Sequence, residues 1–238
     1  MLGKCRLCEA EGQLKHSHIF PEFLYERLYD EKHRSVGVKP YPGVKQDMLQ
    51  KGLREYLLCG SCENQLSKYE RYAAKILRSL PDVSAEKPGT LVVIRKVDYC
   101  KFKLFELSLL WRAGIAEQPS FAAVRLGPHE SRLRKMLIGS DPGKPWEYPC
   151  VLIRFPSPGT VDQILTFPQR YRFLGHQAYV AISYGMIWIF FVSSHSHKIK
   201  ERGSFLSVEG DLPLHVATES GKEFIRGSGK NARRLGLI

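Results

Sequence analysis

The sequence predicts a mixed α+β fold in two parts, a small N-terminal module followed by a larger α+β domain. Two C-x-x-C pairs lie near the N-terminus, and a long amphipathic helix follows the second pair directly. Further on, the apolar run Tyr179–Val192, broken only by Tyr184-Gly185, is typical of a buried antiparallel hairpin. We therefore expect the module in residues 1–81, the α+β domain in residues 91–195, and an irregular basic tail in residues 196–238.

Composition and charge narrow the class of protein. The chain has 238 residues, of which 43% are hydrophobic and 25% charged, so it is neither a disordered nor a collagen-like chain. Its net charge of +12 points to a polyanionic partner, nucleic acid before an anionic membrane. The start, MLGKCRLCEAEG, lacks the apolar segment of a secretory signal, and the longest apolar run is shorter than the roughly 20 residues of a membrane span. These features predict a soluble cytoplasmic protein without a membrane partner.

Four of the six cysteines form the two C-x-x-C pairs, Cys5 with Cys8 and Cys59 with Cys62. Two residues between cysteines let a tight turn direct both thiolates at one ion, so two such turns supply the four ligands of a tetrahedral structural zinc site. The alternative is a redox pair, but neither pair is flanked by a βαβ pattern. Cys100 and Cys150 lie in apolar stretches and are expected to be buried small hydrophobic residues.

The first part contains short elements around these pairs. Residues 10–20 predict a hairpin with its turn at Glu11-Gly12, and Pro21 ends the strand and opens a helical turn over residues 22–25. Residues 30–50 contain Gly, Pro and charged residues and predict a loop or insertion. A strand over Arg54–Leu58 then leads into the second cysteine pair.

The helix after Cys62 continues to about Leu80, where Pro81 stops it, with apolar residues at spacings of three and four. Its opposite face carries four cations, Lys68, Arg71, Lys75 and Arg78. Such a stripe fits either a phosphate backbone or an ordinary solvated helix face, and the sequence does not decide between them.

The second part alternates strands and helices after a linker at residues 82–90. The expected elements are a strand over Leu91–Val97, helices over Lys101–Ala113 and Pro128–Leu137, a strand over Cys150–Phe155, and a hairpin over residues 178–183 and 186–192. No motif assigns residues 91–238 a role, and we expect them to bind DNA, a protein partner or an activating ligand.

Two segments carry a family resemblance. His18 in Ser17-His18-Ile19-Phe20-Pro21, and a C-x-x-C pair that opens a helix about 40 residues later, resemble the HNH endonucleases. The resemblance covers residues 3–80 and is to the zinc-stapled type, which includes phage recombination endonuclease VII. It implies a ββα-metal fold, in which the His of the first strand faces metal ligands on the helix.

The resemblance also implies roles for individual residues. His18 matches the general base, which takes a proton from the water that attacks the phosphodiester. Glu63 matches the metal-ligand position at the helix start, with Glu70 on the same helix face as a second ligand for Mg²⁺ or Mn²⁺. Asn64 is expected to orient the loop or the base. Ser17 departs from the family, because many members have a metal-binding Asp there.

These residues predict a metal-dependent DNA endonuclease with structural zinc and a catalytic Mg²⁺ or Mn²⁺ ion. The residues do not distinguish DNA from RNA. A role in phage defence or in a mobile element follows from the resemblance alone. The alternative is a zinc-stabilised nucleic-acid-binding protein without cleavage activity, which the Ser17 departure supports and the presence of His18 and Glu63 opposes.

Overall fold

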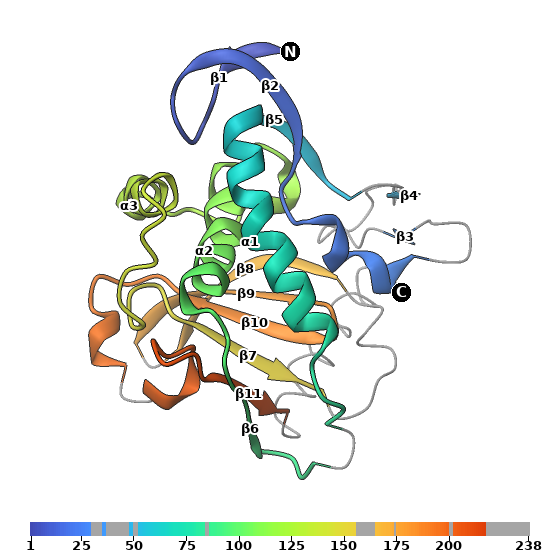
Figure 1. Ribbon diagram of the computed structural model, residues 1–238, viewed down its shortest axis with the longest axis vertical. Coiled ribbons are helices and arrows are strands. Elements are labelled where there is room, and N and C mark those ends of the chain that lie inside the picture. The colour runs from blue at the N-terminus through green and yellow to red at the C-terminus, as the bar shows by residue number, and fades with distance from the viewer. Residues whose placement is uncertain are drawn as a thin grey trace.

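The computed structural model describes residues 1–29, 35–36, 48–49, 52–83, 86–155, 165–173, 175–199 and 202–217. The strands are β1 (Leu2–Lys4), β2 (Glu11–His18), β3 (Ser35–Val36), β4 (Met48–Leu49), β5 (Arg54–Cys59), β6 (Leu91–Ile94), β7 (Cys150–Arg154), β8 (Thr166–Phe173), β9 (His176–Ser183), β10 (Met186–Phe191) and β11 (Leu212–Val216). The α-helices are α1 (Gly60–Arg78), α2 (Tyr99–Ile115) and α3 (Pro128–Ile138). Short 3-10 helices are η1 (Glu22–Leu24), η2 (Glu26–Leu28), η3 (Pro119–Phe121), η4 (Ser196–Lys198) and η5 (Arg202–Ser204). The predicted α+β class is confirmed (Figure 1).

The N-terminal strands form an antiparallel sheet in the order β1-β2-β5, at one end of the molecule (Figure 1). The predicted turn at Glu11-Gly12 is wrong, because both residues lie in β2. The chain reverses earlier, where Cys5 donates its N–H to the Ala10 carbonyl over 2.9 Å and Glu9 takes a positive φ of 64°. The chain therefore reverses in the turn that contains Cys5 and Cys8, and not at the predicted Glu11-Gly12 position.

Helix α1 leaves β5 without a loop, since Cys59 ends the strand and is also the N-cap of the helix. The predicted helix is confirmed and begins at Gly60, just before Cys62. Its buried residues recur at helical spacing on one face, which packs against α2. This connection fixes the second cysteine pair between a strand end and a helix start.

Helix α2 is the central helix of the fold. Asp98 caps it by accepting the Lys101 N–H over 3.0 Å, and from Phe102 to Ala113 every residue is buried. Phe105 contacts Trp188 of β10 edge to face, while α1 packs against α2 as well. In Figure 1, α1 and α2 cross the same face of the large sheet. A helix that is buried all round is typical of a core position.

The large sheet has six strands in the order β6-β11-β7-β10-β9-β8. Neighbours are antiparallel except β11 and β7, which run parallel. The predicted hairpin is confirmed as β9 and β10, with positive φ at Tyr184 (57°) and Gly185 (69°) in its two-residue turn. Strand β11 falls in the segment expected to be irregular, yet it lies between β6 and β7, so this part of that segment is ordered.

The two parts of the chain contribute to one hydrophobic core, which joins Leu66 of α1, Phe105 of α2 and Trp188 of β10. Cys150 is buried as expected, whereas Cys100 is partly exposed at the start of α2. Most of the expected insertion at residues 30–50, and residues 218–238 of the expected tail, lie outside the described residues. Among the helices that the structure describes, none has the length and apolarity needed to cross a membrane.

Candidate active site and zinc centre

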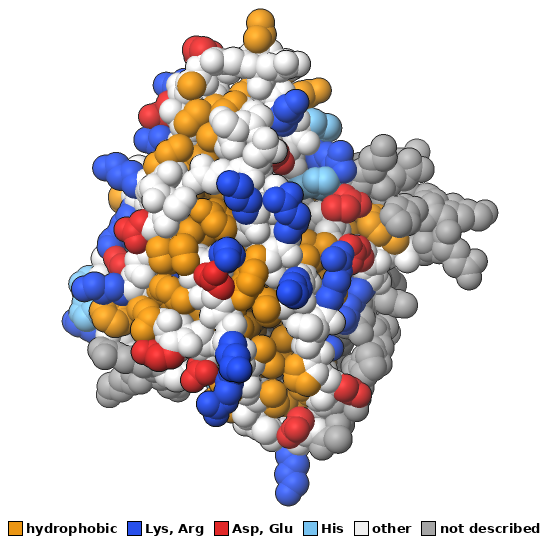
Figure 2. Space-filling model, viewed as in Figure 1, with side chains coloured by type: hydrophobic (Ala, Val, Ile, Leu, Met, Phe, Trp, Pro, Cys, Tyr) orange, Lys and Arg blue, Asp and Glu red, His pale blue; other side chains and the backbone are white. Residues whose placement is uncertain are grey.

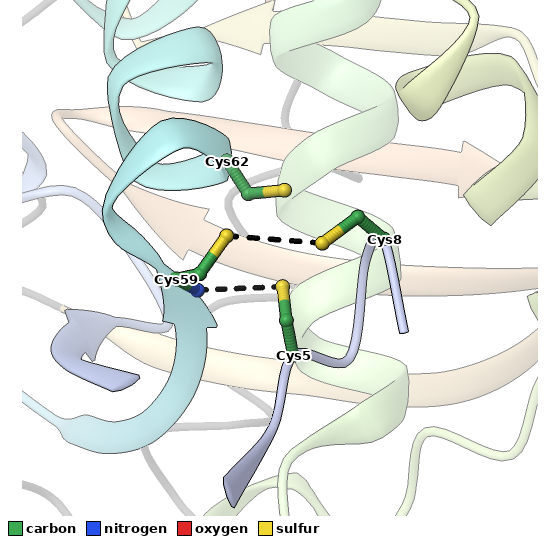
Figure 3. A group of neighbouring side chains, drawn as sticks. All are labelled: Cys5, Cys8, Cys59 and Cys62. Atoms are coloured by element: carbon green, nitrogen blue, oxygen red, sulfur yellow. Dashed lines mark hydrogen bonds between the residues drawn. The ribbon is translucent and has the colours of Figure 1, made fainter. Parts of the chain in front are cut away.

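The four paired cysteines meet where β1, β2, β5 and α1 join. Cys5 and Cys8 lie in the turn between β1 and β2, Cys59 ends β5, and Cys62 lies in the first turn of α1. Their four Sγ atoms lie within 4.8 Å of one another and point toward a common centre (Figure 3). A tetrahedral zinc ion with Zn–S bonds of about 2.3 Å places its sulfurs roughly 3.8 Å apart. The Cys8 and Cys59 sulfurs are 3.7 Å apart, so this donor set fits zinc.

Local hydrogen bonds prepare these sulfurs for a cation. The Cys59 N–H donates to Cys5 Sγ over 3.3 Å. The Ser61 hydroxyl, 3.1 Å from Cys59 Sγ, and the Cys62 N–H together lower the pKa of Cys59 to about 6. Burial raises the pKa of Cys62. A metal must displace the remaining thiol protons, and backbone and hydroxyl donors around the sulfurs stabilise the charge that is left.

His18 is the last residue of β2 and lies opposite Arg54, the first residue of β5. Its Nε2 is 2.6 Å from Glu22 Oε2 and 2.9 Å from Arg54 Nε. A ring nitrogen carries either a proton or a lone pair, so Nε2 donates to Glu22 when protonated and accepts from Arg54 when not. The His18 side chain is 21% exposed, which leaves the imidazole within reach of solvent.

Glu22 is the acidic partner of this histidine. Burial alone would raise the pKa of the Glu22 carboxyl, but the hydrogen bond from the Tyr29 hydroxyl and the contacts with His18 and Arg54 outweigh it and hold the pKa below its ordinary value. Sequence reasoning missed Glu22, Tyr29 and Arg54. The position of Glu22, four residues after His18, was the available signal, whereas Arg54 emerges only from the strand register.

Glu63 lies against the strand that carries His18. Ser17 is fully buried, and its hydroxyl donates to Glu63 Oε2 over 2.7 Å. Ser17 therefore lies directly beside the carboxylate at the start of α1. A hydroxyl bound to a carboxylate in this way keeps the Glu63 side chain in position but adds no negative charge.

Glu70 and Asn64 lie elsewhere on α1. Glu70 forms an ion pair with Arg112 Nη2 at 2.6 Å, and the buried Arg112 also donates from Nη1 to the His18 carbonyl over 2.8 Å. Asn64 is exposed on the solvent side of the helix. The structure thus connects Glu70 to His18 through Arg112, and the roles expected for Glu70 as a ligand and Asn64 as an orienting residue stay predictions.

The structural zinc ion and the catalytic Mg²⁺ or Mn²⁺ ion expected from the sequence need different ligands. Within the residues that the structure describes, the four cysteines are the only group of three or more Cys, His, Asp or Glu side chains placed to bind one ion. Mg²⁺ keeps several waters and binds through one or two carboxylates together with substrate phosphates. Of the two carboxylates expected to bind such an ion, Glu70 is paired with Arg112, whereas Glu63 accepts a hydrogen bond from the neutral Ser17 hydroxyl.

In comparisons with known proteins, no family model, curated protein or solved structure matches the chain. The resemblance to HNH endonucleases therefore rests on the sequence residues that carry it.

Proposed function

We propose that the protein is a metal-dependent endonuclease that hydrolyses phosphodiester bonds in DNA, with His18 as general base. One observation carries the proposal. His18 ends a strand that pairs with β5, and β5 runs directly into α1, with Glu63 of that helix bound to the residue before His18. The resemblance to HNH endonucleases implies two paired strands followed by a helix, and β2, β5 and α1 follow that order next to the four clustered cysteines.

The residues around His18 suit proton transfer. An imidazole with access to solvent takes a proton from water at physiological pH. Once protonated, His18 donates through Nε2 to Glu22, whose lowered pKa keeps it ionised, so the new positive charge is stabilised where it forms. Mg²⁺ or Mn²⁺, held by Glu63 together with water and phosphate oxygens, would neutralise charge on the phosphate.

A zinc-stabilised DNA- or RNA-binding protein without cleavage activity is the second candidate. It is favoured by Ser17, a neutral side chain in the place of a metal-binding carboxylate, and by the engagement of Glu70 with Arg112. Phage defence, a mobile-element origin and a cytoplasmic location belong to the first proposal and rest on the resemblance alone.

A plasmid-nicking assay distinguishes the two candidates. Supercoiled plasmid is incubated with the protein and Mg²⁺ or Mn²⁺, or with neither, beside His18→Ala and His16→Ala. His16 lies on the same strand but stacks on Tyr56, with ring centroids 4.8 Å apart, which makes it a matched control. We expect metal-dependent nicking that His16→Ala retains and His18→Ala loses. Full activity of His18→Ala would remove the assigned base, and plasmid binding without nicking in either metal would favour the second candidate.

A further inference from the structure

The solvent-facing side of α1 carries a row of unpaired cations. Lys68, Arg71 and Lys75 are exposed and follow one another at spacings of three and four, so they lie in one row. None of these side chains forms an ion pair or hydrogen bond with a residue of the described chain. Figure 2 shows Lys and Arg side chains along the path of α1 on this face. We call Lys68, Arg71 and Lys75 the α1 row.

Neither acidic side chains of α1 nor its helix dipole neutralise the positive charge of the α1 row. Like charges three or four positions apart destabilise a helix, and no acidic residue stands at those distances from any of the three cations. The helix dipole favours cations only in the last turn, which Lys68 and Arg71 do not reach. Two other cations of the fold differ in this respect, because Arg78 pairs with Glu26 and Arg134 pairs with Glu9. The α1 row is thus left facing solvent as a concentrated positive strip.

The row lies beside the candidate active site. On the helix, Glu63 and Glu70 occupy the neighbouring face, and they contact Ser17 and Arg112, which adjoin the strand end at His18. Asn64 is exposed one turn before Lys68 and continues the row toward the start of the helix. An α-helix rises about 1.5 Å per residue, so residues 64–75 extend over roughly 16 Å. One DNA strand carries a negative charge about every 3.4 Å along the duplex axis, so this length spans several phosphates.

We propose that the α1 row binds the phosphate backbone of DNA alongside the His18 site. The inference rests on the proposed function for the choice of DNA as the polyanion, but it does not require cleavage. The cations contact phosphates and not base edges, so they contribute affinity that is independent of sequence and sensitive to salt. In this arrangement Asn64 donates from its amide to a phosphate oxygen at the end of the row, which gives it a role other than orienting His18.

The test is the salt dependence of DNA binding by the full chain. All variants carry His18→Ala and are measured without added Mg²⁺ or Mn²⁺, so that cleavage does not interfere. Fluorescence anisotropy with a labelled duplex of random sequence gives the affinity at salt concentrations between 50 and 200 mM. Over this interval, proteins with many phosphate contacts lose about 10³–10⁵-fold in affinity. The variant is Lys68→Gln/Arg71→Gln/Lys75→Gln. The matched control is Lys87→Gln/Arg95→Gln/Lys135→Gln, which removes the same charge from exposed, unpaired cations elsewhere.

Each phosphate contact contributes about 0.9 to the slope of log K against log salt, so the variant is expected to lower the slope by roughly 2.7 and the affinity near 0.1 M salt by roughly 100-fold or more. The control is expected to change the slope by less than about 1. An unchanged slope in the variant, or equal losses in variant and control, would overturn the α1 row as the contact. If the variant no longer binds phosphatidylserine vesicles but still binds DNA like the control, the α1 row contacts a membrane surface and not DNA. If the protein with His18 intact does not nick plasmid in Mg²⁺ or Mn²⁺, while the variant loses slope as expected, the proposed cleavage is wrong and the α1 row remains the DNA contact.

Discussion

The buried guanidinium of Arg112 donates a hydrogen bond to the backbone carbonyl of His18 over 2.8 Å, across 94 positions of sequence. Arg112 belongs to α2, and its Nη2 also pairs with Glu70 of α1. One side chain from the second part of the chain therefore holds both the strand end and the helix of the first part. The geometry of the candidate site depends on this packing as well as on the cysteines.

Replacing Arg112 with Met is expected to lower the free energy of unfolding by roughly 3–5 kcal/mol, because it leaves the Glu70 carboxylate without its partner. Arg112→Met/Glu70→Met, which removes both charges, is expected to regain much of that loss. Urea unfolding of the two variants measures the difference. A single variant within 1 kcal/mol of the parent would show that the pair contributes little.

Metal analysis is expected to find about one zinc ion per chain, lost in Cys59→Ser and retained in Cys100→Ser, since Cys100 lies outside the cluster. Removing zinc leaves four sulfurs within 4.8 Å with no ion to hold β1, β2 and β5 together. Hydrogen exchange should then rise in those strands. Helix α2 should keep its protection because it is buried in the shared core. Uniform exchange along the chain after chelation would contradict this.

Glu22→Gln is expected to move the acid limb of the cleavage pH profile to lower pH. The carboxylate, ionised because its pKa is lowered, stabilises the protonated form of His18, and the amide does so less. Glu26→Gln is the control, because Glu26 pairs with Arg78 instead. The measurement is the cleavage rate as a function of pH for the parent, Glu22→Gln and Glu26→Gln. An unshifted acid limb in Glu22→Gln would show that Glu22 does not stabilise protonated His18 during turnover.

Ser17→Asp is expected to strengthen Mn²⁺ binding and to lower Tm without metal, since it places a second, buried carboxylate next to Glu63. Thermal melts with increasing Mn²⁺ should therefore show a larger upward shift in this variant than in the parent. Ser17→Ala, which only removes the hydroxyl, should show no larger shift than the parent. Equal shifts in Ser17→Asp and the parent would place the ion elsewhere.

Lys103 and Glu106 form a buried pair in α2, with Nζ and Oε2 3.9 Å apart. Burial raises the pKa of Glu106 to about 8, from 4.5, and lowers the pKa of Lys103. The stability that Glu106 contributes is thus fully present below pH 4.5 and is lost as the pH rises through about 8. Lys103 acts oppositely at more alkaline pH.

Lys103→Met/Glu106→Leu should flatten the fall in stability between pH 5 and pH 8 and leave the protein as stable as the parent or more so. Glu106→Leu alone should destabilise the protein most at pH 8, by up to roughly 3–5 kcal/mol, because Glu106 ionises there in the parent and Lys103 then stays buried without its carboxylate. Chemical unfolding at the two pH values measures both effects. If stability falls between pH 5 and pH 8 as steeply in the double variant as in the parent, groups other than Lys103 and Glu106 cause the fall.

Elements with strong local signals were predictable, such as the turn at Tyr184-Gly185 and the helix that opens at Pro128. Strands β8 and β11 were not, since Pro168 and Pro213 argue against strands in the sequence. In the structure, β8 is an edge strand whose register shifts between Thr166 and Gln169, around Pro168. Strand β11 is held between β6 and β7, so neighbours far away in sequence override its weak local preference.

The sequence by itself determined which four cysteines could hold one metal ion, because two residues between cysteines set the geometry of each turn whatever surrounds it. It also placed His18 on a strand, which was expected to continue to Phe20 and which the structure ends at His18. Only the tertiary structure decided which groups His18 and Glu70 meet. Helical periodicity placed Glu70 on the same face as Glu63, but the packing of α1 against α2 brought Arg112 to it. Local spacing determines which side chains share a face, whereas the partner of a charged side chain depends on which element packs against that face.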